Sequence, residues 1–162
     1  ATPADLDDLA RGLLLTEQVI DSAQSIQHVE VRTWLGETLV NVAVAPEALH
    51  QERLGARTVL GNSACGVCGM ESLAQLQARG AAVARARRAV DDRAVARALN
   101  ALPAHQPLNR TTRSVHAAAW CDMAGSITLV REDVGRHNAL DKLVGALAAR
   151  GSLADELSLI HI

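Results

Sequence analysis

Two cysteines in one short segment, Cys65 and Cys68, are the strongest candidates for chemistry in this sequence. Their spacing puts both sulfurs on one side of a turn, and Gly66 and Gly69 let the backbone bend and a partner approach closely. A helix that begins after Cys68 would direct backbone N–H groups at the sulfurs and favour the thiolate. A thiolate can attack a persulfide and carry its terminal sulfur, and a second cysteine can relay it. This pattern therefore favours a sulfur-carrying site.

Other interpretations of the cysteine pair stay open. A structural zinc site needs four ligands, and the sequence has no second Cys-x-x-Cys, although Cys121 and His116 would complete the set if folding brought them close. A thioredoxin-like redox pair usually lies in a βαβ context, with aromatic residues nearby that are absent here. Cysteines are also often buried as small hydrophobic residues.

A zinc deaminase is the remaining alternative for the cysteine pair. Zinc deaminases carry H-x-E and then P-C-x-x-C. His28 and Glu30 match the first part, but Ala64 stands where the proline is expected. The histidine also lies in an alternating, strand-like stretch instead of opening a helix. A zinc-dependent, deaminase-like hydrolase is therefore kept as an alternative function, and no intrinsic metal is expected.

A second polar cluster lies where a predicted strand meets a predicted helix. Asp133, Arg136, His137 and Asn138 fall within six residues. Such junctions in α/β proteins lie at the carboxyl ends of strands, where ligands bind, and a helix N-terminus offers N–H groups to anions. The guanidinium of Arg136 would add a fork for phosphate or carboxylate. The alternative is that Asp133 or Asn138 only caps the helix.

Apolar periodicity predicts an α/β fold with helices on a mixed sheet. The expected elements are a first helix that starts at Thr2-Pro3-Ala4-Asp5, a hairpin within Ile26–Val44 that turns at Leu35-Gly36, a short helix from Pro46 to Leu49, a short strand Thr58–Leu60, a helix Gly69–Gln77, a helical stretch in Ala81–Leu102, a loop between Pro103 and Pro107, strands Val115–Cys121 and Ile127–Val130, and a last helix with Leu140, Leu143, Val144 and Leu147 on one face. His116 lies in an apolar run, which is more typical of a hydrogen-bonded core histidine.

Composition excludes several function classes. A net charge of −2 gives no bulk attraction to nucleic acid, and two aromatic residues, Trp34 and Trp120, provide no base-stacking platform. No apolar run reaches the ~18–20 residues that a membrane span needs. Three cysteines, an odd number, disfavour a disulfide framework and favour the reducing cytoplasm.

We divide the chain into an N-terminal helix and hairpin portion at 1–55, an α/β core at 56–156 and a tail at 157–162. The tail resembles a translated sequencing adapter, so we expect it to be non-native and leave it out of the fold prediction.

Taken together, these motifs resemble the formate dehydrogenase accessory sulfurtransferases. The resemblance runs from Thr2 to about Ala149 and rests on Cys65 to Gly69, the long block Arg131 to Lys142, Val115 to Ala119, and the early segments Thr2-Pro3, Asp8 to Ala10 and Leu14 to Glu17. The block is highly specific, whereas the cysteine pair alone would be weak. The family is longer at both ends, so we expect a fragment.

The resemblance implies a sulfur relay that ends at a molybdenum (or tungsten) cofactor. A cysteine desulfurase would load a persulfide onto Cys65, Cys68 would assist, and the sulfur would pass to the bis-guanine-dinucleotide cofactor of formate dehydrogenase. The Asp133–Asn138 segment and His116 would lie near the cofactor or hold the loop. Because the cofactor is a large polyanion, Arg131 is a further expected neighbour beside Arg136.

The same resemblance implies a cytidine deaminase-like fold with a partial N-terminal α/β appendage, and a cytoplasmic homodimer. A different class of function also remains, in which the chain is a non-catalytic scaffold that only binds the cofactor or the dehydrogenase.

Overall fold

The computed structural model describes residues 1–54, 90–151 and 158–161. Cys65 and Cys68 therefore lie outside the described residues, as do the predicted strand Thr58–Leu60 and the predicted helix Gly69–Gln77. The described elements are α1 (Leu6–Thr16), β1 (Ile26–Trp34), β2 (Glu37–Val44), α3 (Asp92–Ala101), α4 (Pro107–Thr112), β3 (His116–Cys121), β4 (Ile127–Asp133), α5 (Arg136–Ala149) and β5 (Ser158–His161), with 3-10 helices at Ala23–Ser25, Pro46–Ala48, Gln51–Arg53 and Leu102–His105.

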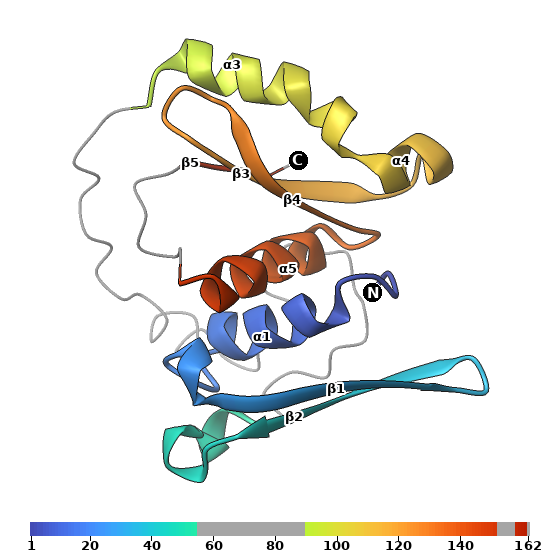
Figure 1. The fold of residues 1–162 in the computed structure, drawn as a ribbon, viewed down its shortest axis with the longest axis vertical. Coiled ribbons are helices and arrows are strands. Elements are labelled where there is room, and N and C mark those ends of the chain that lie inside the picture. The colour runs from blue at the N-terminus through green and yellow to red at the C-terminus, as the bar shows by residue number, and fades with distance from the viewer. Residues whose placement is uncertain (55–89, 152–157, 162) are drawn as a thin grey trace.

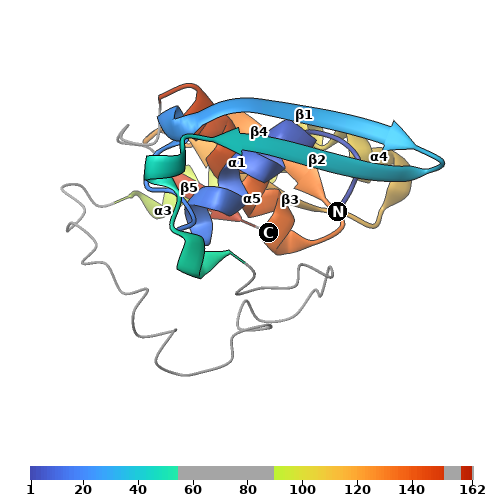
Figure 2. The same cartoon turned by 90° about the horizontal axis from the view of Figure 1, so that it is seen from below.

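The elements form successive layers around one antiparallel sheet of order β4-β3-β5 (Figure 1). Helices α3 and α4 lie on one side of this sheet, and α5 covers the other side. Helix α1 packs along the outer side of α5, and the antiparallel hairpin β1–β2 lies over α1, as the view from below also shows (Figure 2). The end of the sheet at which β4 leads into α5 lies beside the N-terminus of the chain.

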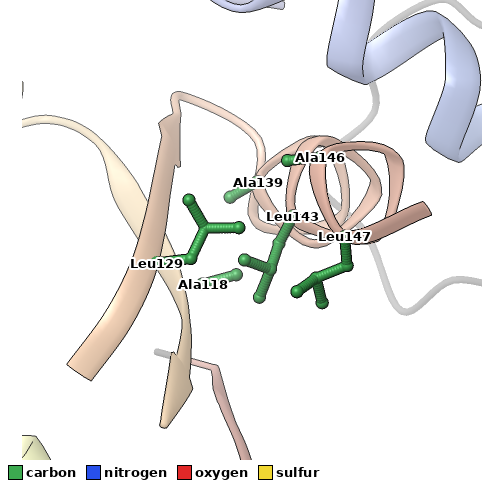
Figure 3. Packing of buried hydrophobic residues seen from close by; sticks show 6 residues of the cluster. All are labelled: Ala118, Leu129, Ala139, Leu143, Ala146 and Leu147. Atoms are coloured by element: carbon green, nitrogen blue, oxygen red, sulfur yellow. The ribbon is translucent and has the colours of Figure 1, made fainter. Parts of the chain in front are cut away.

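Alternation along β3 and β4 divides the core between the two faces of the sheet. Ala117, Ala119 and Cys121 pack with Ala98 and Leu102 on the side of α3. On the other face, six buried residues of the sheet and α5 pack together (Figure 3), namely Ala118, Leu129, Ala139, Leu143, Ala146 and Leu147. Small alanine side chains on β3 keep the helices close to the sheet on both sides.

The contact between α1 and α5 is a direct backbone contact at two glycines. A Cβ atom on Gly12 would lie 1.7 Å from the carbonyl oxygen of Asp141, and a Cβ on Gly145 would lie 1.9 Å from that of Asp8. No side chain larger than hydrogen fits at either position without moving a backbone. The two glycines therefore set the short distance between the helices.

The hairpin follows its prediction closely. Val29 pairs with Val42 and Val31 pairs with Val40, so β-branched residues face each other across the strands. The turn is made by Leu35 and Gly36, whose φ angles of 51° and 83° suit the right-handed twist of the strands. The strands expected around Val115–Cys121 and Ile127–Val130, the helix that begins near Arg136 and the short helix at Pro46 are confirmed as well.

Several expectations about local structure are wrong. Helix α1 begins at Leu6 with Asp5 as its N-cap, so it starts later than the predicted start at Thr2. Pro107 opens helix α4, and the segment between the two prolines is a 3-10 helix followed by α4 instead of a loop. The described strands pair only antiparallel, so they do not form the expected mixed sheet.

The division of the chain at residue 55 stays a prediction. Strand β5, from the tail that we excluded, pairs antiparallel with β3. The tail therefore belongs to the described sheet, although the fold prediction left it out. Because strands pair through backbone groups, this pairing is independent of the origin of the tail. In the part of the chain that the structure describes, no helix combines the length and apolar character needed to cross a bilayer.

The glycine contact predicts a large effect from one methyl group. Gly145→Ala should lower the free energy of unfolding by at least about 2 kcal/mol, because overpacking against a backbone cannot be relieved by a rotamer change. The intrinsic helix preference of alanine acts in the opposite direction, by up to about 1 kcal/mol. Urea unfolding followed by circular dichroism measures the difference. Asn100→Ala, at an exposed position of α3, is the control and should change stability by less than about 0.5 kcal/mol. Equal stability of Gly145→Ala and the wild type would contradict the close approach.

Candidate functional site

The end of the sheet at which β4 leads into α5 gathers most of the described polar residues of the predicted site. Asp133 is the last residue of β4 and lies opposite His116, the first residue of β3. After two intervening residues α5 begins with Arg136 and His137, both partly buried. The fold thus brings His116 beside a segment that lies far from it in the sequence. We call the residues 134–135 between β4 and α5 the β4–α5 connection.

A buried ion pair holds this end of the sheet together. The side chains of Asp133 and Lys142 are both fully buried, and Lys142 Nζ lies 2.6 Å from Asp133 Oδ2. The ammonium also donates to the carbonyl oxygens of Thr2 at 3.1 Å and Glu132 at 3.3 Å. An ammonium has three donors, so the buried charge of Lys142 is fully hydrogen-bonded. This satisfies the condition under which a buried charge is tolerated.

The carboxylate of Asp133 receives four hydrogen bonds. Oδ2 accepts from Lys142 and from the Thr2 N–H at 2.8 Å, and Oδ1 accepts from the Gly135 N–H at 2.8 Å and from Asn138 Nδ2 at 3.1 Å. Burial by itself would raise the pKa of Asp133, but these donors, with Lys142 the strongest, hold the pKa below its ordinary value. Asp133 is therefore an ionised group in the interior at neutral pH.

These contacts give Asp133 and Asn138 an internal supporting role. The N-cap of α5 is Gly135, and no side chain makes a capping hydrogen bond there. The prediction that Asp133 or Asn138 caps this helix is therefore wrong. Asp133 instead binds the N–H of Gly135, and Asn138 braces the same carboxylate. That either residue contacts a cofactor stays a prediction.

Arg131 turns toward α1. Its Nη2 lies 2.7 Å from Asp8 Oδ2, its Nε donates to the same oxygen at 2.7 Å, and Nη1 donates to the carbonyl oxygen of Val130. The side chain of Arg131 is 19% exposed, so it links β4 to the N-terminal helix from a largely buried position. That Arg131 neighbours the cofactor stays a prediction; in the structure its guanidinium binds Asp8.

His116 is exposed, so the expectation of a core histidine is wrong. It lies at the start of β3, where the sheet ends and the side chain faces solvent. Its neighbour in the register is the buried Asp133. His116 is exposed because the buried part of β3 begins only at the next residue, Ala117.

Zinc ligation by Cys121 together with His116 is excluded by the strand between them. The two residues lie at opposite ends of β3, roughly 17 Å apart at the usual rise of a strand. Cys121 is fully buried, and burial followed by the nearby charge of Asp122 raises the pKa of its thiol. Among the described residues no group of three or more His, Cys, Asp or Glu side chains could hold a metal ion. The cysteine pair lies outside that part of the chain, so the zinc alternative for Cys65 and Cys68 stays open.

The deaminase-like histidine lies in a strand. His28 is an exposed residue of β1, and Glu30 forms an ion pair with Arg32 at 2.9 Å. His28 and Glu30 lie two positions apart in β1 and therefore point to the same face of the hairpin. This context differs from the helix start that the deaminase pattern requires.

Three residues of this region were missed by the sequence interpretation: Lys142, Thr2 and Glu132. Lys142 had a usable signal, because Ala139, Lys142, Leu143 and Ala146 share one helical face, and that face is buried. A lysine on an apolar face indicates a buried partner. Thr2 had no such signal, since its partners lie more than 130 positions away.

Glu132 points to the face of β4 opposite to Asp133 and binds the N-terminal turn of α4. Its two oxygens accept from the N–H groups of Leu108 at 2.9 Å and Asn109 at 2.8 Å, in the first turn of that helix. It also lines a cavity of about 240 Å³ between β4, α4 and the N-terminal segment, together with Ala4, Asp5, His105, Pro107, Leu108 and Val130. The carboxylate of Glu132 thus stabilises the N-terminus of α4, where backbone N–H groups favour an anion.

The ion pair predicts the effects of removing one charge or both. Asp133→Asn should lower the free energy of unfolding by about 3–5 kcal/mol, because it leaves the Lys142 ammonium buried without a counter-charge. The double variant Asp133→Asn with Lys142→Met removes both charges and should be more stable than the single variant. Urea unfolding at neutral pH measures both. If the double variant lost as much free energy of unfolding as Asp133→Asn and Lys142→Met lose together when made singly, the two charges would not depend on each other.

The lowered pKa of Asp133 also predicts a pH dependence. The ordinary carboxyl value is 3.8, and the folded value lies below it. The ionised carboxylate therefore contributes stability at every pH above about 4, and this contribution is lost as the pH falls through the folded pKa. Urea midpoints of the wild type measured between about pH 2 and pH 7 should fall at the acid end. The double variant lacks the carboxylate and should show a shallower fall; equal slopes would exclude Asp133 as their cause.

Comparison with known proteins identifies relatives for almost the whole chain. A family model described as the FdhD/NarQ family matches residues 1–161. A sulfur carrier protein FdhD from Xanthomonas axonopodis pv. citri (strain 306) is 47% identical over 151 residues, which are 91% of this chain and 52% of that protein. A protein of the same name from Bordetella parapertussis (strain 12822) is 40% identical over 150 residues, or 93% of this chain and 54% of that protein.

A solved structure has a similar fold. It is a crystal structure of a proposed formate dehydrogenase accessory protein from Desulfotalea psychrophila, with a TM-score of 0.59 and 19% identity over 98% of this chain and 53% of that one. At this identity the likeness concerns the fold alone, and the cytidine deaminase-like fold stays a prediction. The chain spans about half the length of the relatives it matches. Because the family model covers residues 1–161, this chain belongs to the FdhD/NarQ family.

Proposed function

We propose that this chain carries sulfur as a persulfide on Cys65, with Cys68 assisting, for the maturation of a formate dehydrogenase. The observation that carries the proposal is the family match over residues 1–161, which includes the glycine-flanked cysteine pair. Relatives at 40–48% identity are named sulfur carrier proteins. Sulfur carriage needs a reactive thiol, and this pair has the spacing and glycines expected for one.

The loading step follows ordinary thiol chemistry. A cysteine desulfurase presents a protein persulfide, and the Cys65 thiolate attacks its terminal sulfur. One S–S bond forms on Cys65 while the S–S bond of the donor breaks, and the donor cysteine leaves as a thiolate. No net oxidation or reduction occurs, so the step needs no further reagent. We propose that the Cys68 thiolate then attacks the inner sulfur of the Cys65 persulfide, so that a Cys65–Cys68 disulfide forms and the S–S bond of the persulfide breaks. The carried sulfur leaves as hydrosulfide to the bis-guanine-dinucleotide molybdenum cofactor, which is the acceptor substrate.

The end of the sheet at the β4–α5 connection has the chemistry to receive an anionic acceptor. Arg136 and His137 open α5, and the exposed His116 lies across the register from Asp133. The negative charge of Asp133 is matched by Lys142 inside the protein, so it does not oppose an anion outside. A helix N-terminus adds a partial positive charge. A homodimer in the cytoplasm, served by a desulfurase and serving a formate dehydrogenase, completes the proposal.

Mass spectrometry tests the carrier role directly. After incubation with a cysteine desulfurase and free cysteine, the wild-type chain should gain the mass of one sulfur atom, about 32 Da, and lose it on reduction. Cys65→Ala should abolish the adduct, because the attacking thiolate is missing. Cys121→Ala is the matched control and should load normally, since Cys121 is fully buried.

Other outcomes would replace the proposal. Normal loading of Cys65→Ala would remove Cys65 from the mechanism. Stoichiometric zinc in the purified protein, with no sulfur adduct, would favour the deaminase-like hydrolase. Cofactor binding and dehydrogenase maturation that survive loss of both Cys65 and Cys68 would favour a scaffold without a sulfur step.

A further inference from the structure

Thr2 is bound through its N–H, carbonyl and hydroxyl groups to three residues around the β4–α5 connection. Its N–H donates to Asp133 Oδ2 at 2.8 Å, and its carbonyl oxygen accepts from Lys142 Nζ at 3.1 Å. Its hydroxyl oxygen accepts from the N–H of Val134 at 3.0 Å. Thr2 thus contacts Asp133, Val134 and Lys142, all more than 130 positions away in the sequence. These three contacts fix Thr2 at this end of the sheet.

The hydroxyl of Thr2 restrains a residue that packing does not hold. The side chain of Val134 is 52% exposed, so burial contributes little to its position. The next residue, Gly135, is held by Asp133 from within the same segment. Val134 is instead restrained by Thr2, which lies 132 positions earlier in the sequence. Pro3 follows Thr2 and favours an extended backbone at Thr2, which limits how far the hydroxyl can move.

The position of Val134 affects the residues that follow it. The connection is two residues long, and α5 begins directly after it with Arg136 and His137. A short connection transmits a displacement because it has few torsions to absorb it. The Thr2 hydroxyl thus acts on the first turn of α5 through one backbone hydrogen bond.

We infer that Thr2 is a positioning residue, whose hydroxyl fixes the Val134 N–H and so keeps Arg136 and His137 in place for the anionic acceptor. The inference rests on the proposed function, because only that function gives the end of the sheet an acceptor. It assigns to the N-terminal segment a role in the transfer of sulfur and none in its loading. Loading at Cys65 is therefore independent of Thr2.

The local part of the inference is tested by amide hydrogen exchange. Thr2→Val keeps the shape of the side chain but removes the acceptor, and Thr2→Ser keeps the acceptor. The Val134 amide should exchange about tenfold faster in Thr2→Val, in line with the loss of one hydrogen bond, and at the wild-type rate in Thr2→Ser. Unchanged exchange in Thr2→Val would overturn the inference.

Thr16→Val separates positioning from simple loss of stability. The Thr16 hydroxyl donates to Asp141 Oδ1 at 2.9 Å and, like that of Thr2, joins the N-terminal part of the chain to the α5 region. Its removal costs one hydrogen bond at the far end of α1. Thr16→Val should therefore lower stability about as much as Thr2→Val while leaving Val134 exchange unchanged.

The functional part is tested with guanosine diphosphate, which carries the guanosine and diphosphate groups of the proposed acceptor. Calorimetric titration at a temperature at which every variant is folded should give a Kd about five- to tenfold weaker for Thr2→Val. Thr2→Ser and Thr16→Val should bind like the wild type. Persulfide loading, measured by mass on the same samples, should be the same in all four proteins.

Each outcome decides one question. Equal weakening in Thr2→Val and Thr16→Val would reduce Thr2 to a stabilising residue and overturn the inference. Normal loading with wild-type affinity in Thr2→Val, or no binding of the probe by the wild type, would overturn it too, while the carrier role would stand. Failure of the wild type to load sulfur would instead sink the proposed function, whatever Thr2→Val does to the exchange of Val134.

Discussion

The ion pair of Asp133 and Lys142 is the interaction on which the arrangement at the β4–α5 connection depends. Neither side chain reaches water, so each charge must find its partners inside the protein. Those partners come from the end of β4, from α5 and from Thr2 near the chain's start. A buried charge without them would cost several kcal/mol. The three segments are therefore held in one relative position by a single electrostatic requirement.

The close packing of α1 on α5 makes this requirement achievable. Gly12 and Gly145 allow the two helix backbones to touch, which brings α1 over α5. Asp8 of α1 then reaches Arg131 of β4 at 2.7 Å, and the segment before α1 reaches the connection through Thr2. The two glycines set the distance between the helices, and the polar contacts join α1 and the segment before it to β4 and the connection. Stability and site geometry thus depend on the same contact.

The polar block between Arg131 and Asn138 serves several structural purposes because strand residues alternate. Arg131 and Asp133 face α1 and α5, whereas Glu132 faces the opposite side and binds the start of α4. A block that looks like one cluster in the sequence is therefore distributed over two faces of the sheet. The residues that open α5, and the exposed His116, are the ones that this division leaves at the end of the sheet.

Local pattern determined which elements form. The hairpin turn at Leu35, the strand that ends at Cys121 and the helix that begins at Arg136 could be predicted, because periodicity and turn preferences act over a few residues. Tertiary structure alone decided that Thr2 binds the β4–α5 connection and that Lys142 pairs with Asp133 and the Thr2 carbonyl. The partners of a buried polar group are chosen by which segments packing brings together, and that choice depends on contacts across the whole chain.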